Sequence, residues 1–149
     1  MAVTKFKLEG KVKRGMLGSY QTEFGGRPRL LLAYADAAYA SECGRYFRRL
    51  GWEVEMVASG AEARDLVGEY QPNVVVLDAL LLDEGGWLTC AKISTENPRL
   101  RIVLVVDERT ENAQDRLHLV GASQLVCRKD GGEGLAMSIL GKASLSEAV

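Results

Sequence analysis

Short hydrophobic runs alternate with amphipathic segments from residue 29 onward, at intervals of roughly twenty to thirty residues. This pattern is typical of repeated βα units, in which each strand is followed by a helix that packs on a parallel sheet. The third and fourth runs are continuously apolar, as expected of central strands covered on both faces, whereas the second alternates like an edge strand. The predicted strands cover residues 30–34, 53–57, 74–77, 102–106 and 124–127.

Segments with helical spacing of apolar residues lie between these runs and after the last one. The first ends at Gly51, a residue type that often stops a helix. The second opens with a capping box from Ser59 to Glu62 and ends before Pro72. We therefore expect helices at about 40–50, 59–70, 86–96, 111–120 and 133–141.

The chain of 149 residues is long enough for one sizeable core, and two domains would each fall below the usual size. Residues 1–26 differ from the remainder because they are basic and contain glycine. The alternation of lysine with apolar residues at positions 5–8 fits a solvated arm, an added edge strand or a segment that docks on an acidic partner. We predict a basic N-terminal extension over 1–26, one domain over 27–141 and a short tail over 142–149.

Charge and hydropathy exclude several classes of function. The chain carries 19 Lys and Arg against 20 Asp and Glu, so no overall field favours nucleic acid or an anionic membrane. No run approaches the roughly twenty apolar residues that a membrane span needs, and the N-terminus shows no signal segment. We expect a cytoplasmic protein with no membrane span and no nucleic-acid partner.

The chemistry-bearing residues show no enzyme motif. Cys43, Cys90 and Cys127 lie far apart and His118 is the only histidine, so neither a disulfide framework nor a zinc site is expected. We predict three structural thiols in a reducing compartment. The glycine pairs lack the flanking residues of a P-loop, a dinucleotide fingerprint or a nucleophile elbow, so an independent enzymatic activity is not expected.

The residues that decide function follow the strands, because the crevice of such a sheet lies at the carboxyl ends of its strands. Asp78 ends the third run, and Gly86 opens the next helix after a short loop. The motif at 58–63, Ala-Ser-Gly-Ala-Glu-Ala, follows the second strand, and a Gly-Ala pair at 121–122 precedes the fifth. Together these motifs resemble the receiver domain of bacterial response regulators, over about three quarters of the chain.

The resemblance implies a fold and an acceptor. The fold is a flavodoxin-like, doubly wound parallel sheet of five strands in the order 2-1-3-4-5, with helices on both faces. In the family, an aspartate at the end of the third strand accepts a phosphoryl group with the help of Mg²⁺, and Asp78 matches that position. The acidic pair that holds the metal corresponds to Tyr34 and Ala35, and Asp36 follows one place later. The loss of the pair should remove most of the affinity for Mg²⁺.

Three further pocket positions also depart from the family pattern. Val106 stands where the family has the switch hydroxyl, and valine cannot hydrogen-bond a phosphoryl oxygen. Leu125 replaces the aromatic residue that moves with the hydroxyl. Arg128 replaces the family lysine, so a cation survives with a different geometry. The usual switch machinery is therefore expected to be absent, with no metal and no other cofactor bound.

Asp78 has two interpretations: a phosphoacceptor, or a carboxylate paired with Arg128 or Lys129 that holds a fixed, active-like arrangement. Trp52 and Trp87 are candidates either for binding anchors or for partial burial in the core. Further acidic residues around the same rim could build a metal site, although solvated loop acids are commoner: Asp83, Glu84, Asp107 and Glu108.

The functional hypothesis is an atypical, stand-alone receiver (a pseudo-receiver) that binds a protein independently of phosphorylation. One alternative is a phosphorylatable, Mg²⁺-dependent receiver with Asp78 as acceptor, where Asp36 and Asp78 would be the metal ligands. The other is a flavodoxin-like module that binds a small ligand in the crevice near Tyr34, Ala35 and Asp78.

The resemblance also implies the kind of partner. A histidine kinase or another signalling protein is expected, and a homodimer is the further possibility. Family members usually signal through the face made by the fourth helix, fifth strand and fifth helix. On this face the candidate contact residues are Arg116, His118, Leu119 and Met137.

Overall fold

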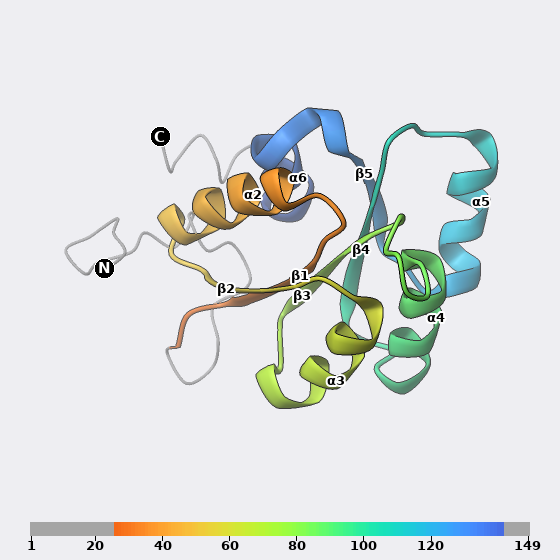
Figure 1. Cartoon of the computed structure of the whole chain (residues 1–149), viewed down its shortest axis with the longest axis horizontal. Helices are drawn as coiled ribbons and strands as arrows, with labels where there is room; N and C mark the ends of the chain where they lie inside the picture. Colours follow the sequence, from red (N-terminus) through yellow and green to blue (C-terminus); the bar gives the residue numbers. More distant parts are fainter. Residues whose placement is uncertain (1–25, 142–149) are drawn as a thin grey trace.

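The computed structural model describes residues 26–141, and the predicted N-terminal extension and C-terminal tail lie outside the described residues apart from Gly26. All five strands pair in parallel, in the order β2-β1-β3-β4-β5, which confirms the predicted flavodoxin-like sheet (Figure 1). β2 occupies one edge, as its alternating pattern predicts. The strands are β1 (Arg29–Ala33), β2 (Glu53–Val57), β3 (Val74–Asp78), β4 (Arg101–Val106) and β5 (Gln124–Cys127).

Each strand is followed by a helix, and the helices cover both faces of the sheet. Figure 1 shows α2 and α6 together on one face, with α3, α4 and α5 on the other. The helices are α2 (Ala37–Arg49), α3 (Gly60–Tyr70), α4 (Gly86–Glu96), α5 (Glu111–Val120) and α6 (Gly131–Leu140). A single 3₁₀ turn, η2 (Arg128–Asp130), joins β5 to α6.

The core has two layers because successive side chains of a strand point to opposite faces. In β3, Val74 and Val76 pack under α2 and α6, whereas Val75 and Leu77 pack under α3, α4 and α5. All four side chains are fully buried. The continuously apolar third run is therefore explained by burial on both faces, as predicted.

Two helices begin earlier than predicted. α2 begins at Ala37 because the Asp36 carboxylate accepts hydrogen bonds from the backbone N–H groups of Ala38 and Tyr39, at 3.0 and 3.2 Å. α6 begins at Gly131 rather than 133 because η2 leads directly into it. The capping box of α3 is confirmed: Ser59 Oγ accepts from Glu62 N at 3.1 Å, while Glu62 Oε1 accepts from Ala58 N at 3.3 Å.

The three cysteines and Trp52 are buried in the core. Cys43, Cys90 and Cys127 are free buried thiols, and burial raises the pKa of the Cys43 and Cys90 thiols to about 12. Trp52 is 1% exposed and meets Phe47 edge to face, with ring centroids 5.3 Å apart, so of its two interpretations the structure shows burial in the core and not a binding anchor. Between residues 26 and 141, no helix has the length and apolar character that a membrane crossing requires.

Candidate functional site

Asp78 lies at the end of β3, in the crevice where the predicted site was placed. The residue is 2% exposed. Its Oδ1 accepts a hydrogen bond from the backbone N–H of Leu80 at 2.9 Å, and its Oδ2 accepts one from Ala35 N at 3.3 Å. The loops after β3 and β1 therefore hold the carboxylate from two sides.

Arg128 makes the remaining contacts of this carboxylate. Its Nη1 donates to Asp78 Oδ2 at 2.5 Å and its Nη2 donates to Asp78 Oδ1 at 3.2 Å, while its Nε donates to Asp107 Oδ1 at 2.7 Å. These hydrogen bonds, first of all those to Asp78, raise the pKa of the Arg128 guanidinium above its ordinary value. Such a two-pronged contact fixes the orientation of both groups. Of the two cations considered from sequence, Arg128 rather than Lys129 pairs with Asp78.

The guanidinium is also covered by an aromatic ring. The Arg128 carbon Cζ lies 5.9 Å from the centre of the Tyr39 ring, within the range of a cation–π contact. Tyr39 is buried, and its hydroxyl makes no hydrogen bond among the described residues. Burial raises the pKa of this phenol. Asp78, Arg128, Asp107 and Tyr39 thus form one packed cluster, which we call the Arg128 cluster.

A surface cavity of about 400 Å³ opens beside the Arg128 cluster. The predicted small-ligand crevice was placed at Tyr34, Ala35 and Asp78, and none of these lines this cavity. The cavity is instead shifted toward α2 and η2. Its lining consists of Asp36, Ala38, Tyr39, Glu42, Asp107, Arg128 and Lys129.

The positions of the family's acidic pair carry no carboxylate. Tyr34 is half-buried against the core under α2 and α6, Ala35 is exposed, and the Asp36 carboxylate caps α2. Mg²⁺ needs several free oxygen ligands in octahedral geometry. Of the possible carboxylate ligands, Asp78 is already hydrogen-bonded to the Arg128 guanidinium and Asp36 caps α2. The residues at this site therefore do not fit Mg²⁺. Within residues 26–141, no three His, Cys, Asp or Glu side chains are grouped so that they could hold a metal ion.

The two switch positions belong to the core. Val106 is 7% exposed and Leu125 is 2% exposed, and both pack in the layer under α3, α4 and α5. The sequence did not point to Arg109, in the loop after β4, which donates from Nη2 to the Leu125 carbonyl oxygen at 3.0 Å. The loop is therefore tied to β5 beside the site.

Two of the four rim acids lie elsewhere, which corrects the prediction. Asp83 accepts hydrogen bonds from the backbone N–H groups of Gly60 and Ala61, at 2.9 and 3.0 Å, and these bonds lower the pKa of its carboxyl. Asp83 is thus a second cap on α3. Asp107 does reach the site through Arg128, and Glu108 is exposed in the same loop.

Glu84 is the other misplaced rim acid, and it anchors the β3–α4 loop. Arg64 donates to both of its oxygens at 3.0 Å, and the buried Thr89 hydroxyl donates at 2.7 Å. The hydrogen bonds from Arg64 are the main reason why the pKa of Glu84 is lowered. The same loop carries two exposed leucines, Leu80 at 56% and Leu82 at 95% exposure. Asp83 and Glu84 therefore fasten to α3 and α4 a loop that presents apolar side chains to solvent.

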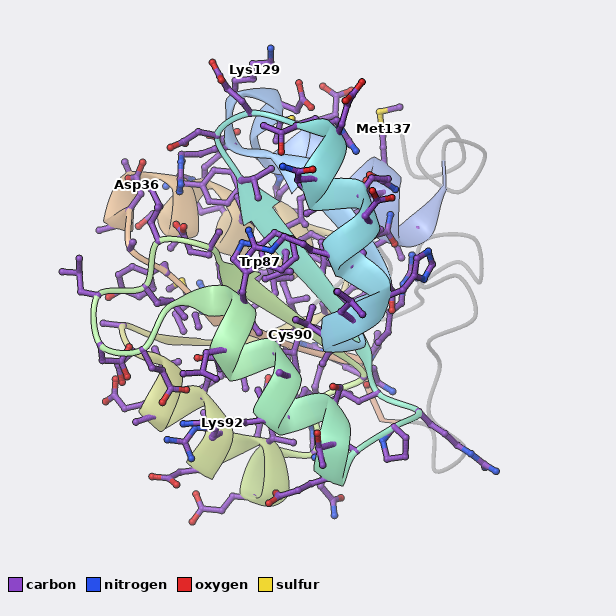
Figure 2. The ribbon with its side chains drawn as sticks, turned by 90° about the vertical axis from the view of Figure 1, so that its right-hand side faces the viewer. Asp36, Trp87, Cys90, Lys92, Lys129 and Met137 are labelled. Atoms are coloured by element: carbon purple, nitrogen blue, oxygen red, sulfur yellow. The ribbon has the colours of Figure 1, made fainter. Side chains whose placement is uncertain are left out.

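The predicted interaction face is exposed on α5 and α6. Leu119 is 84% exposed, Met137 is 38% exposed, and His118 is also exposed. Arg116 lies over the ring of Trp87 on α4, with its Cζ 4.1 Å from the ring centre. Figure 2 views this side of the molecule and labels Trp87 and Met137. Trp87 is half-buried and serves to join α4 to α5.

Comparison with known structures shows that the fold is shared with receiver proteins. The chemotaxis protein CheY4 of Vibrio cholerae superposes with a TM-score of 0.72 at 16% identity, over 76% of this chain and 97% of that chain. The CheY-like receiver domain protein of Methanospirillum hungatei gives 0.71 at 20% identity, over 83% and 97%.

Sequence comparison adds a curated relative and a family. Over 93 residues the chain is 29% identical to the probable transcriptional regulatory protein TcrX of Mycobacterium tuberculosis, which covers 62% of this chain and 39% of that protein. The match thus spans well under half of that relative's length. Residues 31–135 match the response regulator receiver domain. Since these residues make up more than half of the chain, the protein belongs to the response regulator receiver domain family.

Proposed function

We propose that this receiver domain of two-component signalling is a phosphorylation-independent module that binds another signalling protein. Receiver domains are generally signalling modules without an enzymatic activity of their own. The observation that carries the proposal is the two-pronged bridge between Arg128 and Asp78, which occupies the position of the phosphoacceptor. The positive charge that a phosphorylated receiver gathers around its acceptor is supplied here by the protein itself.

The bridge disfavours phosphoryl transfer for an electrostatic reason. Both Asp78 oxygens accept hydrogen bonds from Arg128, so an attack on a phosphoryl donor would first have to break these bonds. The donor is an anion, and the site lacks the carboxylates that would bring a dication to offset the repulsion. Arg128 supplies one charge, which it shares with Asp107.

The contacts around the switch positions support a fixed conformation. Val106 has no hydroxyl to move toward Asp78, and Leu125 has neither a ring nor a polar edge to relocate. The bond from Arg109 to the Leu125 carbonyl oxygen holds the loop after β4 in place. We infer that the interaction face on α5 and α6 keeps one conformation whether or not a phosphodonor is present. A partner would then bind in proportion to its own concentration and not to the activity of a kinase.

The test is to incubate the full chain with Mg²⁺ and acetyl phosphate, measure its intact mass, and record amide NMR spectra with and without beryllofluoride. We expect no phosphoryl adduct and no change of the Val106 and Leu125 amide signals. An adduct that maps to Asp78, together with partner binding that is lost in Asp78→Asn, would instead establish the Mg²⁺-dependent receiver.

A matched variant makes a negative result informative. The combination of Tyr34→Asp, Ala35→Asp, Val106→Thr and Arg128→Lys reverses four of the five departures from the family pocket and leaves Leu125 unchanged. This variant should bind Mg²⁺ and accept a phosphoryl group under conditions in which the natural chain does not. If the variant folds and both proteins remain unmodified, the pocket residues are not what prevents phosphorylation of the natural chain, and the electrostatic argument is wrong.

A further inference from the structure

Among the strands of residues 26–141, β2 lies at the edge of the sheet and has one hydrogen-bonded neighbour, β1. Glu53 N donates to Pro28 O and Tyr34 N donates to Val57 O, both at 2.9 Å, so residues 53 and 57 face β1. The backbone N–H and C=O groups of successive residues alternate in direction along a strand. The backbone groups of Val54 and Met56 therefore point away from β1, toward the open edge of the sheet. Among the described residues, the hydrogen bond recorded on this outer side runs from Arg48 Nη2 to Val54 O at 3.2 Å.

The outer edge thus presents three backbone groups that can pair: the N–H of Val54 and both the N–H and the C=O of Met56. An edge of this kind is a template for a further strand unless it is blocked. Natural edges are commonly blocked by proline, a bulge, a covering helix or charged side chains. β2 contains no proline, and its five residues pair in regular register with β1.

The charged and the apolar side chains of β2 lie on opposite faces of the sheet. Glu53 and Glu55 are exposed on the α3 side, where both raise the pKa of Tyr70 in addition to the larger effect of burial. Glu53 forms an ion pair with Arg29 at 3.4 Å, whereas no ion pair is recorded for Glu55 within 26–141. α3, which packs on the same face of the sheet, carries further exposed carboxylates at Glu62, Asp65 and Glu69.

The opposite side of β2 is apolar. Val54 is buried under α2, and Met56 is half-buried with its sulfur near Gly44, where an added Cβ would lie 3.5 Å away. A strand that paired with this edge would therefore meet acidic side chains on one face and Met56 on the other. Its own sequence should alternate between basic and apolar residues, since side chains of a strand alternate between faces.

We propose that the chain's own residues 5–8 bind along the outer edge of β2 as an added strand. This segment alternates lysine with phenylalanine and leucine, so that its two lysines match Glu53 and Glu55 while its apolar residues match Met56. Residues 1–25 carry five Lys and Arg against two Glu, which gives the opposite charge to this acidic face. Strand addition of this kind draws affinity from backbone hydrogen bonds and register from side-chain alternation.

The length of the connecting chain allows this arrangement. β1 begins at Arg29, which lies in register with Glu53 at the start of β2. The residues between 8 and 29 can span on the order of 60 Å when extended, several times the length of a five-residue strand. Either strand direction is within reach. The proposal is independent of Asp78 and Arg128, so it stands apart from the proposed function.

The experiment measures hydrogen exchange of the Val54 and Met56 amides in the full chain by NMR. In the natural sequence both amides should be protected, and Lys5→Glu with Lys7→Glu should raise their exchange rates about tenfold. The matched control, Lys11→Glu with Lys13→Glu, makes the same change of charge outside the segment and should have little effect. Exchange of the central Val75 amide should be the same in every variant, which shows that the body remains folded.

A charge exchange completes the test. Glu55→Lys alone should weaken the protection of Met56, and its combination with Lys5→Glu and Lys7→Glu should restore part of it. Equal and fast exchange of both outer amides in the natural chain and in all variants would overturn the proposal. Protection that increases with protein concentration would show that the segment comes from a second copy, and would overturn its assignment to the same chain.

Discussion

Arg128 and Asp78 approach each other within 2.5 Å from opposite ends of the site, one after β5 and the other at the end of β3. Their side chains are 17% and 3% exposed, so both charges are largely shielded from water and the Asp78 carboxylate depends on Arg128 for compensation. Breaking such a pair by removing one partner leaves a buried charge unpaired, which costs far more than the pair contributes when intact.

Arg128→Ala should therefore destabilise the fold by about 3 kcal/mol, measured by chemical denaturation. Combining Arg128→Ala with Asp78→Asn should recover part of this loss, because the unpaired carboxylate is removed. The control is Asp107→Asn, whose side chain is 59% exposed and which should cost less than about 1 kcal/mol. If Arg128→Ala and Asp107→Asn reduce the free energy of unfolding equally, the buried bridge does not stabilise the fold more than the exposed ion pair does.

Glu84 should make the stability depend on pH. Its pKa is lowered in the folded protein, so its contribution to stability is fully present well above the unfolded value of about 4.3 and is lost as the pH falls through the lower, folded value. Glu84→Gln should reduce stability at pH 7 by about 1–2 kcal/mol and flatten the loss of stability in acid. Denaturation curves at a series of pH values measure both effects. The control is Glu69→Gln on exposed α3, which should leave the curve unchanged.

Two glycines should respond in opposite ways to alanine. A Cβ on Gly86 would lie 2.2 Å from the Asp78 carbonyl oxygen, so Gly86→Ala must shift the backbone at the end of β3 and should cost well over 1 kcal/mol. Gly68 is exposed on α3 with nothing within 4 Å of an added Cβ. Gly68→Ala should stabilise the protein by about 0.5–1 kcal/mol through helix propensity. Thermal melts of both variants test the pair, and destabilisation by Gly68→Ala would contradict the assigned packing.

Self-association, if it occurs through the interaction face, should depend on Leu119. This side chain is 84% exposed on α5, and Leu119→Glu should weaken a dimer by about tenfold or more. Leu88→Glu, at a 49% exposed position on α4, is the matched control and should leave the association constant unchanged. Analytical ultracentrifugation gives the constant. A natural chain that sediments as a monomer at concentrations on the order of tens of micromolar would remove the homodimer.

The strands and most helices could be predicted because their signals are local. β2 and β5 begin and end at the predicted residues, and so do α4 and α5, since hydrophobic alternation, capping residues and terminal glycines define them within one segment. The predicted first residue of a helix was less accurate where it depended on a capping side chain whose orientation the sequence does not give. Asp36 was considered as a metal ligand and instead caps α2, a choice that depends on the rotamer and not on the residue type.

The parts of the site that were missed join residues far apart in the chain. Asp83 was grouped with the rim acids because it follows β3, yet it binds the N-terminus of α3, 23 residues before it. Arg101 lies just before the predicted fourth strand and was given no role, yet it begins β4, donates to the Ile139 and Ser138 carbonyl oxygens at 2.9 Å and holds the end of α6. Such partners are set by how the layers pack, which no local pattern records.

The fastened β3–α4 loop has a consequence for the entropy of binding. A mobile loop loses conformational freedom when a partner orders it, and this loss subtracts from affinity. Here Asp83 and Glu84 fix the loop when the domain folds, while Leu82 stays 95% exposed at its outer side. A surface that buries Leu82 would therefore meet a loop whose backbone is already held in position, and its association would not be opposed by the cost of ordering that backbone.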